Sequence, residues 1–141
     1  MKLLFVLLLL TVTIFLVSCN YCELWGATSL GNNFSLVESD EKHVAIDYCV
    51  SKCCDSGIPI VPANITEYNF DTKWIVAKSE NSTGSTYWVI DKNFKTKFGY
   101  GSDMREKILS NVLGPLDSVE FIKKIKQNHI DLAFKKYKSL Q

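Results

Sequence analysis

The sequence predicts an α+β domain: an antiparallel β-meander followed by two or three C-terminal α-helices packed on one face. Two observations predict this class. Between residues 34 and 98, apolar and polar side chains alternate in short runs that are rich in β-branched and aromatic residues. From residue 103 onwards, the apolar period lengthens to that of a helix. Strands first and helices afterwards favour helices gathered on one side of an antiparallel sheet.

The expected strands are short and separated by polar turns. The alternation predicts strands at 34–37, 43–49, 65–70, 73–78 and 86–91, with a further short strand at 94–98. The pair 65–70 and 73–78 is expected to form a hairpin. Residues 51–57 are expected to be a loop, because Pro59 and Pro62 interrupt regular pairing after them.

Helix-start patterns occur twice in the C-terminal third. Asp103 precedes Glu106 by three residues, and Asp117 precedes Glu120 in the same way. The first helix is expected to end at Gly114-Pro115. The apolar stripes expected to face inward are Met104, Ile108, Leu109, Val112 and Leu113 in the first helix, and Phe121, Ile122 and Ile125 in the second. A last short helix is expected to begin at Asp131, with Leu132, Phe134 and Tyr137 facing inward.

The first nineteen residues indicate export and lipid attachment. Lys2 is followed by an uncharged apolar run over residues 3–17. Such a run is too short for the roughly 20 residues of a membrane-spanning helix. It suits the apolar region of a signal peptide, which needs about 7–15 residues. Residues 16–19, Leu-Val-Ser-Cys, resemble the bacterial lipobox, whose cysteine thiol receives a diacylglycerol. The alternative is an ordinary secretory signal that leaves Cys19 as half of a disulfide.

The leader divides the chain into three expected parts. We predict a lipoprotein signal peptide at 1–18, a lipidated tether at 19–33 and a single α+β domain at 34–141. The expected partner is membrane lipid bound through acylated Cys19, with the domain outside the cytoplasm in the cell envelope. Removal of Lys2 lowers the formal net charge from +1 to zero, so charge points to no nucleic-acid partner.

Lysines are concentrated near the C-terminus, and two interpretations of this run stay open. Such a run is expected to be the solvated face of an amphipathic helix. The alternative is a basic surface that lies on an anionic membrane. The lysines concerned are Lys123, Lys124, Lys126, Lys135, Lys136 and Lys138.

Four cysteines follow the expected lipidation site, and an exported chain can join them as disulfides. Four cysteines allow three connectivities. Adjacent cysteines rarely bond each other, so we expect the first to pair with one of the later group and the second with another. The alternative is a metal site that combines the last three with His43. Zinc sites usually show two separated cysteine pairs, so we predict no metal. The four disulfide candidates are Cys22, Cys49, Cys53 and Cys54.

No motif in the sequence carries recognisable catalytic chemistry. It contains no Gly-x-Ser-x-Gly, no phosphate-binding glycine loop and no His-Glu-x-x-His. His43 and His129 are expected to lie on the surface. We therefore predict no catalytic residue and no cofactor.

Two carboxylates beside tryptophans suggest one alternative, a ligand pocket. Asp71 and Asp91 each end an aromatic strand, near Trp74 and Trp88. Two acids in an apolar setting can divide acid and base roles. Turn capping also explains both acids, because aspartate bonds its own local backbone in turns. Aromatic residues on strands are usually core or cross-strand pairs.

Four blocks of sequence carry a resemblance to a known family. They are residues 58–71, 73–78, 87–92 and 114–121. In their order, the chain resembles a family of small bacterial lipoproteins catalogued as a domain of unknown function, over about residues 34–137. The chain departs from that family at 49–54 and at 100–113. The resemblance implies an envelope address and a coherent fold, but no activity.

The leading functional hypothesis is a non-enzymatic, lipid-anchored envelope protein that binds a protein partner or supports an envelope assembly. One alternative is a small-ligand-binding or hydrolytic lipoprotein that uses the pocket near Trp74 and Trp88. Another is an inhibitor or immunity-type lipoprotein.

Overall fold

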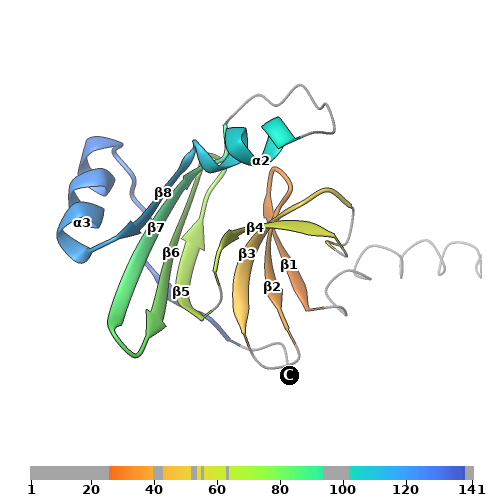
Figure 1. Ribbon diagram of the computed structural model, residues 1–141. Coiled ribbons are helices and arrows are strands. Elements are labelled where there is room, and N and C mark those ends of the chain that lie inside the picture. The colour runs from red at the N-terminus through yellow and green to blue at the C-terminus, as the bar shows by residue number, and fades with distance from the viewer. Residues whose placement is uncertain are drawn as a thin grey trace, which may run out of the picture.

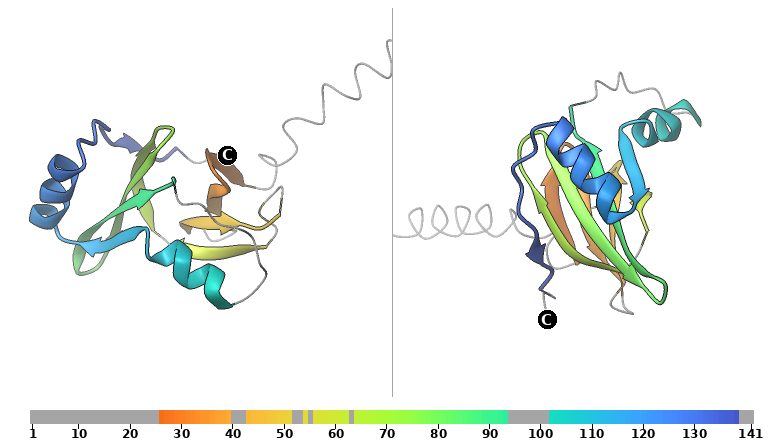
Figure 2. Two further views of the ribbon diagram at one scale, coloured as in Figure 1. Left: turned by 90° about the horizontal axis from the view of Figure 1, so that it is seen from above. Right: turned by 90° about the vertical axis from the view of Figure 1, so that its left-hand side faces the viewer.

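The fold is a sandwich of two antiparallel sheets with one helix on its outer side (Figure 1). The computed structural model describes residues 26–39, 43–51, 54, 56–62, 64–93 and 102–138. The layers follow one another as four-stranded sheet, five-stranded sheet and helix (Figures 1 and 2). Neither helix of the described part is long and apolar enough to cross a membrane.

The four-stranded sheet has strands in the order of the sequence, β1-β2-β3-β4. Side chains alternate along it, so that Phe34 and Leu36 point inward from one strand and Ile46 from the next. Asn32 and Asn33 join the first two strands with φ of 50° and 66°, which suits the tight turn of a hairpin. The strands are β1 (Ala27–Gly31), β2 (Phe34–Glu38), β3 (Val44–Cys49) and β4 (Gly57–Val61).

The five-stranded sheet has the order β8-β7-β6-β5-β9. Its centre is a long hairpin in which eight residue pairs run from Trp74 opposite Asp91 to Asn81 opposite Gly84. β9 is only two residues long and pairs with Glu67 and Tyr68 of β5. The strands are β5 (Ile65–Phe70), β6 (Trp74–Asn81), β7 (Gly84–Asp91), β8 (Val112–Leu116) and β9 (Lys135–Lys136).

Two helices interrupt the second half of the chain. α2 (Ser102–Leu109) lies across one end of the sandwich and buries Ile108 in the inner core (Figure 1). α3 (Ser118–Gln127) packs against β7 and β8 on the outer side of the five-stranded sheet. Its start was correctly predicted, because the Asp117 side chain accepts a hydrogen bond from the Glu120 backbone N–H at 2.8 Å.

The two faces of the five-stranded sheet are buried in separate clusters. The inner cluster lies between the sheets, and its fully buried members come from both of them. The outer cluster lies beneath α3 and the segment that leads to β9. The inner cluster is built on Leu30, Phe34, Leu36, Val44, Ile46, Tyr48, Ile60, Val61, Ile65, Ile75, Ala77, Trp88, Ile90 and Ile108. The outer one is built on Trp74, Val76, Val89, Phe121 and Ile130.

The predicted fold class is wrong in its arrangement. A single meander followed by a layer of C-terminal helices was expected, whereas the strands form two sheets. β8 follows the first C-terminal helix and β9 follows the second. The chain crosses between the sheets after Val61, and local alternation looks the same on either side of such a crossing.

β8 occupies residues that were expected to end the first helix. The helical stripe that includes Val112 and Leu113 continues past the true end of α2 at Leu109. A turn at Ser110 and Asn111 intervenes, and the following residues add a strand beside β7. Apolar residues of a short edge strand can therefore fit a helical period by chance.

Other segments also differ from the expectation. β4 contains Pro59, which has no backbone N–H to donate; an edge strand tolerates this because one of its sides has no neighbouring strand. β1 lies inside the range 19–33 that was predicted as a tether. Residues 135–136 form β9 instead of continuing a third helix. The expected strand at 94–98 lies outside the described residues.

Candidate functional site

The structure separates the two tryptophans of the predicted pocket. Trp74 belongs to the outer cluster and Trp88 to the inner one, so they lie on opposite faces of the same sheet. Their strands are neighbours, with Trp88 directly opposite Ala77. One pocket cannot be lined by both rings.

The two aspartates of that pocket cap turns, as the alternative interpretation predicted. Asp71 accepts hydrogen bonds from the backbone N–H groups of Lys73 and Trp74, at 2.7 and 2.6 Å. Asp91 accepts one from the backbone N–H of Asn93 at 2.9 Å. Each carboxylate is thus engaged with its own turn.

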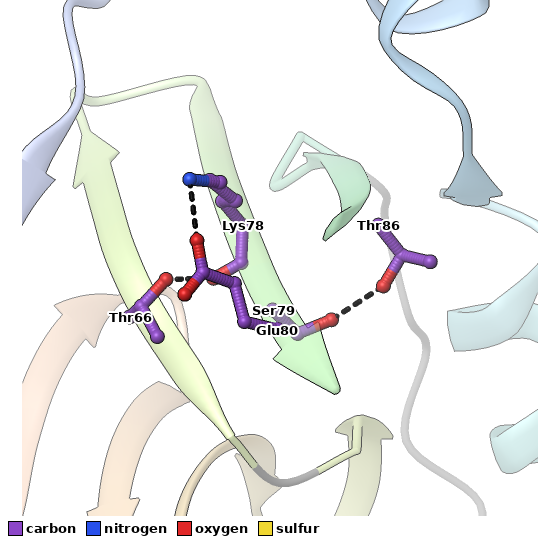
Figure 3. Close-up of polar contacts among 5 residues, drawn as sticks. All are labelled: Thr66, Lys78, Ser79, Glu80 and Thr86. Carbon is purple, nitrogen blue, oxygen red and sulfur yellow. Dashed lines mark hydrogen bonds and ion pairs between the residues drawn. The ribbon is translucent and has the colours of Figure 1, made fainter. Parts of the chain in front are cut away.

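A group of polar side chains lies where β6 ends and β7 begins (Figure 3). The hydroxyl oxygens of Ser79 and Thr86 lie 2.6 Å apart, and the Trp88 indole N–H donates to Ser79 at 3.3 Å. On the other side of β6, Lys78 forms an ion pair with Glu80 at 2.7 Å. This contact raises the pKa of Lys78 and lowers that of Glu80. The group satisfies the buried polar atoms at the strand ends.

A buried lysine joins the two sheets at the opposite end. The Lys92 amino group donates to the Leu30 carbonyl of β1 at 2.7 Å and lies 5.3 Å from the Phe70 ring centroid. Its backbone carbonyl accepts from the Asn32 side chain at 3.0 Å. Burial lowers the pKa of Lys92, and the charge of Asp71 opposes that shift. Lys92 follows β7 directly, and nothing in its local sequence marked it as buried.

A disulfide closes the loop between β3 and β4. It joins Cys49 and Cys54, whose Cα atoms lie 4.7 Å apart. This agrees with the expectation that Cys49 pairs with another member of the later cysteine group. Cys49 is buried, whereas Cys54 is half-buried and has a φ of 59°, in the left-handed region. Cys19, Cys22 and Cys53 lie outside the described residues.

Asp47 lies beside this disulfide, on the outer side of the four-stranded sheet. Gly57 pairs with Cys49 across the β3–β4 ladder. A Cβ built on Gly57 would stand 3.0 Å from an Asp47 carboxyl oxygen and 3.2 Å from the Cys54 sulfur. The absent side chain thus leaves room for both groups. Burial raises the pKa of the Asp47 carboxyl.

The alternative of a metal site gains no support. Within the described ranges, no three His, Cys, Asp or Glu side chains are grouped closely enough to hold a metal ion. The sulfurs of Cys49 and Cys54 are bonded to each other. A ring nitrogen of His43 lies 2.9 Å from the Asn64 side-chain oxygen.

α3 presents an apolar surface to solvent. Val119 and Ile122 are 74% and 52% exposed, and Lys123 and Lys126 lie on the same side of the helix. Phe121, Ile122 and Ile125 were expected to face inward, but only Phe121 and Ile125 do so. We call these four residues, Val119, Ile122, Lys123 and Lys126, the α3 surface.

Sequence reasoning missed the group formed by Asp47, Gly57 and the disulfide. Asp47 looks like any polar position of an alternating strand. The register that sets Gly57 opposite Cys49 depends on a bulge in the β3–β4 ladder and cannot be read locally. A glycine soon after a cysteine cluster was the one available signal.

Comparison with known proteins gives one family match. A family model described as "Protein of unknown function (DUF3997)" matches residues 31–138, which include every strand from β2 to β9. No curated protein and no solved structure matches the chain. The match confirms the resemblance to a family of unknown function that the sequence suggested.

Proposed function

Because this chain belongs to the DUF3997 family, whose function is unknown, we propose its function from its own residues. It is a lipid-anchored protein of the cell envelope, and its sandwich domain binds a protein partner outside the cytoplasm. The observation that carries the proposal is the order of the leader: Lys2, the apolar run 3–17, and then Ser18 and Cys19.

The disulfide supports the address. Bonds such as Cys49–Cys54 form and persist mainly in oxidising compartments outside the cytosol. The described fold begins at Gly26, seven residues after Cys19. Seven residues span at most about 25 Å when fully extended. An anchor at Cys19 would thus hold the domain close to the membrane surface.

The α3 surface supports the choice of a protein partner. Single exposed apolar residues are common, but here two of them share one side of a helix with two lysines. This side faces away from the five-stranded sheet, and the four-stranded sheet with β1 lies beyond that sheet (Figure 1). The strand nearest to the expected anchor and the α3 surface are therefore on opposite sides of the domain.

The anchor is tested by membrane fractionation and intact-mass measurement in a bacterial host. We expect the wild-type chain to sediment with membranes, to need detergent for release and to carry an acyl mass on Cys19. Cys19→Ala is expected to carry no acyl mass. An unmodified Cys19 in a wild-type chain that has lost its signal peptide would refute the anchor.

The partner is tested by crosslinking of the membrane-bound protein. We expect Ile122→Asp to lose a crosslinked product that the wild type forms. Lys107→Asp, on the exposed side of α2, is the matched control and is expected to retain that product. Retention of the same product by Ile122→Asp would remove the α3 surface as the partner site.

A further inference from the structure

We propose that Cys49–Cys54 is a thiol-exchange site, in which Asp47 acts as the base for an incoming thiol. The substrate class is a cysteine-type thiol, which forms a mixed disulfide with Cys54. Three independent features of the described residues carry this assignment. They are the unequal burial of the two cysteines, the position of a carboxyl group near the Cys54 sulfur, and the backbone conformation of Cys54.

The two cysteines differ in burial. Cys49 is the last residue of β3 and is buried, whereas Cys54 lies in the loop and is half-buried. Thiol–disulfide exchange requires direct approach of the attacking sulfur to one sulfur of the bond. Cys54 is therefore the sulfur that is attacked and Cys49 the one that leaves. Val50 is 40% exposed beside the bond and offers an apolar contact to the incoming molecule.

The Asp47 carboxyl lies near the sulfur that is attacked. One carboxyl oxygen and the Cys54 sulfur each lie within 3.2 Å of the point where a Gly57 Cβ would stand. Most cysteine-type thiols are protonated at neutral pH, and only the thiolate is the nucleophile. A carboxylate beside the electrophilic sulfur can accept the proton as the new bond forms. Burial raises the pKa of Asp47, which makes it a stronger base than an exposed aspartate.

Cys54 also has an unfavourable backbone conformation while the bond is intact. Its φ of 59° is in the left-handed region, which residues other than glycine seldom adopt. Such conformations are unfavourable and persist only where the surrounding structure imposes them. Once its bond to Cys49 is broken, Cys54 is free to relax.

The exchange balances without another reactant. The thiol proton moves to the Asp47 carboxylate while the thiol sulfur bonds to Cys54. The Cys49–Cys54 bond breaks, and its electron pair leaves with the Cys49 sulfur. Cys49 then takes a proton, and Asp47 returns to its ionised form. The Asp47 carbonyl oxygen, 3.9 Å from the Cys49 sulfur, can accept a hydrogen bond from the new thiol. The products are one thiol and one mixed disulfide.

The test uses the oxidised full chain in detergent and reduced glutathione as the probe thiol. The rate of mixed-disulfide formation is measured between pH 6 and pH 10, and its position is mapped by alkylation and peptide mass spectrometry. We expect glutathione on Cys54 and a free thiol on Cys49. At pH 7, Asp47→Asn is expected to react ~100-fold more slowly, at the low end of what a general base contributes.

The pH profile separates a base from a structural role. Above the glutathione pKa, the thiolate needs no base, so the wild type and Asp47→Asn are expected to converge. Asp47→Glu keeps a carboxyl group and is expected to retain most of the wild-type rate at pH 7. Asp131→Asn, an exposed aspartate beyond α3, is the matched control and is expected to be unchanged.

Three results would overturn the proposal. The first is a rate for Asp47→Asn at pH 7 that equals or exceeds the wild-type rate, which would mean that the carboxylate only repels thiolates. The second is attachment of glutathione to Cys49 instead of Cys54. The third is reaction of the bond only in urea at a concentration that unfolds the chain, which would make it a purely structural disulfide.

Discussion

The two faces of the five-stranded sheet are buried by different means. The inner face packs against another sheet, and Phe34, Ile46 and Ile90 there are fully buried. The outer face is covered by one helix and a short segment, and its cluster includes Phe121 and Ile130, which keep 9% and 7% exposure. The inner face therefore depends on distant segments meeting, whereas the outer face depends mainly on a local cover.

The difference is encoded in the strands that the two faces share. Residues 74–77 of β6, Trp-Ile-Val-Ala, are all buried, because alternate side chains serve alternate clusters. A continuous apolar run is typical of a strand that is covered on both sides. An alternating strand such as β2 is covered on one side only.

The largest loss of stability is expected from a cavity between the two sheets. Phe34 is fully buried and packs edge-on against Tyr48, with ring centroids 5.3 Å apart. We expect Phe34→Ala to lower the free energy of unfolding by about 4 kcal/mol, within the range of buried Phe→Ala changes. Urea unfolding followed by tryptophan fluorescence measures this. A loss below about 1 kcal/mol would mean that the sheets are not held by this face.

A smaller loss is expected from adding one methyl group to the inner face. A Cβ on Gly114 would stand 2.4 Å from a Trp88 ring carbon, and its φ of 149° is unfavourable for other residues. We expect Gly114→Ala to cost about 2–3 kcal/mol, as overpacking does. Gly84→Ala is the control for backbone conformation, because φ is also positive there and no atom lies within 4 Å of its Cβ. Equal losses in the two variants would show that the contact with Trp88 is unimportant.

A smaller loss of stability is expected from removing a buried ring on the outer face. The Phe121 ring stacks on Tyr87 and Phe134, with centroids 4.9 and 5.5 Å away. We expect Phe121→Ala to cost about 2 kcal/mol, less than a fully buried phenylalanine because its site is nearer to solvent. Hydrogen exchange should rise in α3 while the central strands stay protected. Equal loss of protection in α3 and β6 would remove the distinction between the two faces.

The smallest effect is expected at the solvent side of the same helix. Val119 is 74% exposed, so Val119→Ser is expected to change the free energy of unfolding by no more than about 0.5 kcal/mol. Thermal unfolding of the wild type and the variant measures this. A larger destabilisation would indicate that Val119 is covered in solution.

Local patterns predicted the two strands of the β6–β7 hairpin well. The expected strands 73–78 and 86–91 correspond to β6 and β7, and the predicted capping by Asp71, Asp91 and Asp117 is confirmed. These features depend on neighbours in the chain, so short windows of sequence contain them.

Features that depend on distant pairing could not be predicted in this way. β9 is two residues that become a strand only because β5 is beside them. Trp74 and Trp88 looked like one site because both are aromatic and near an aspartate, but their opposite directions follow from the cross-strand register. The proximity of Asp47 to Cys54 depends on a glycine in another strand.

The last strand meets the beginning of the fold. The Tyr137 hydroxyl donates to the Glu38 carboxylate, and the Glu38 backbone N–H donates to the Gly26 carbonyl at 2.8 Å. The Tyr137 N–H also donates to Thr66 at 2.9 Å. A chain synthesised from its N-terminus must therefore keep one edge of β5 open until residues 135–137 have emerged. The pairing of β5 with β9 therefore forms only after residues 135–137 are available. A shortened chain that lacks these residues would expose an unpaired strand edge, which favours aggregation.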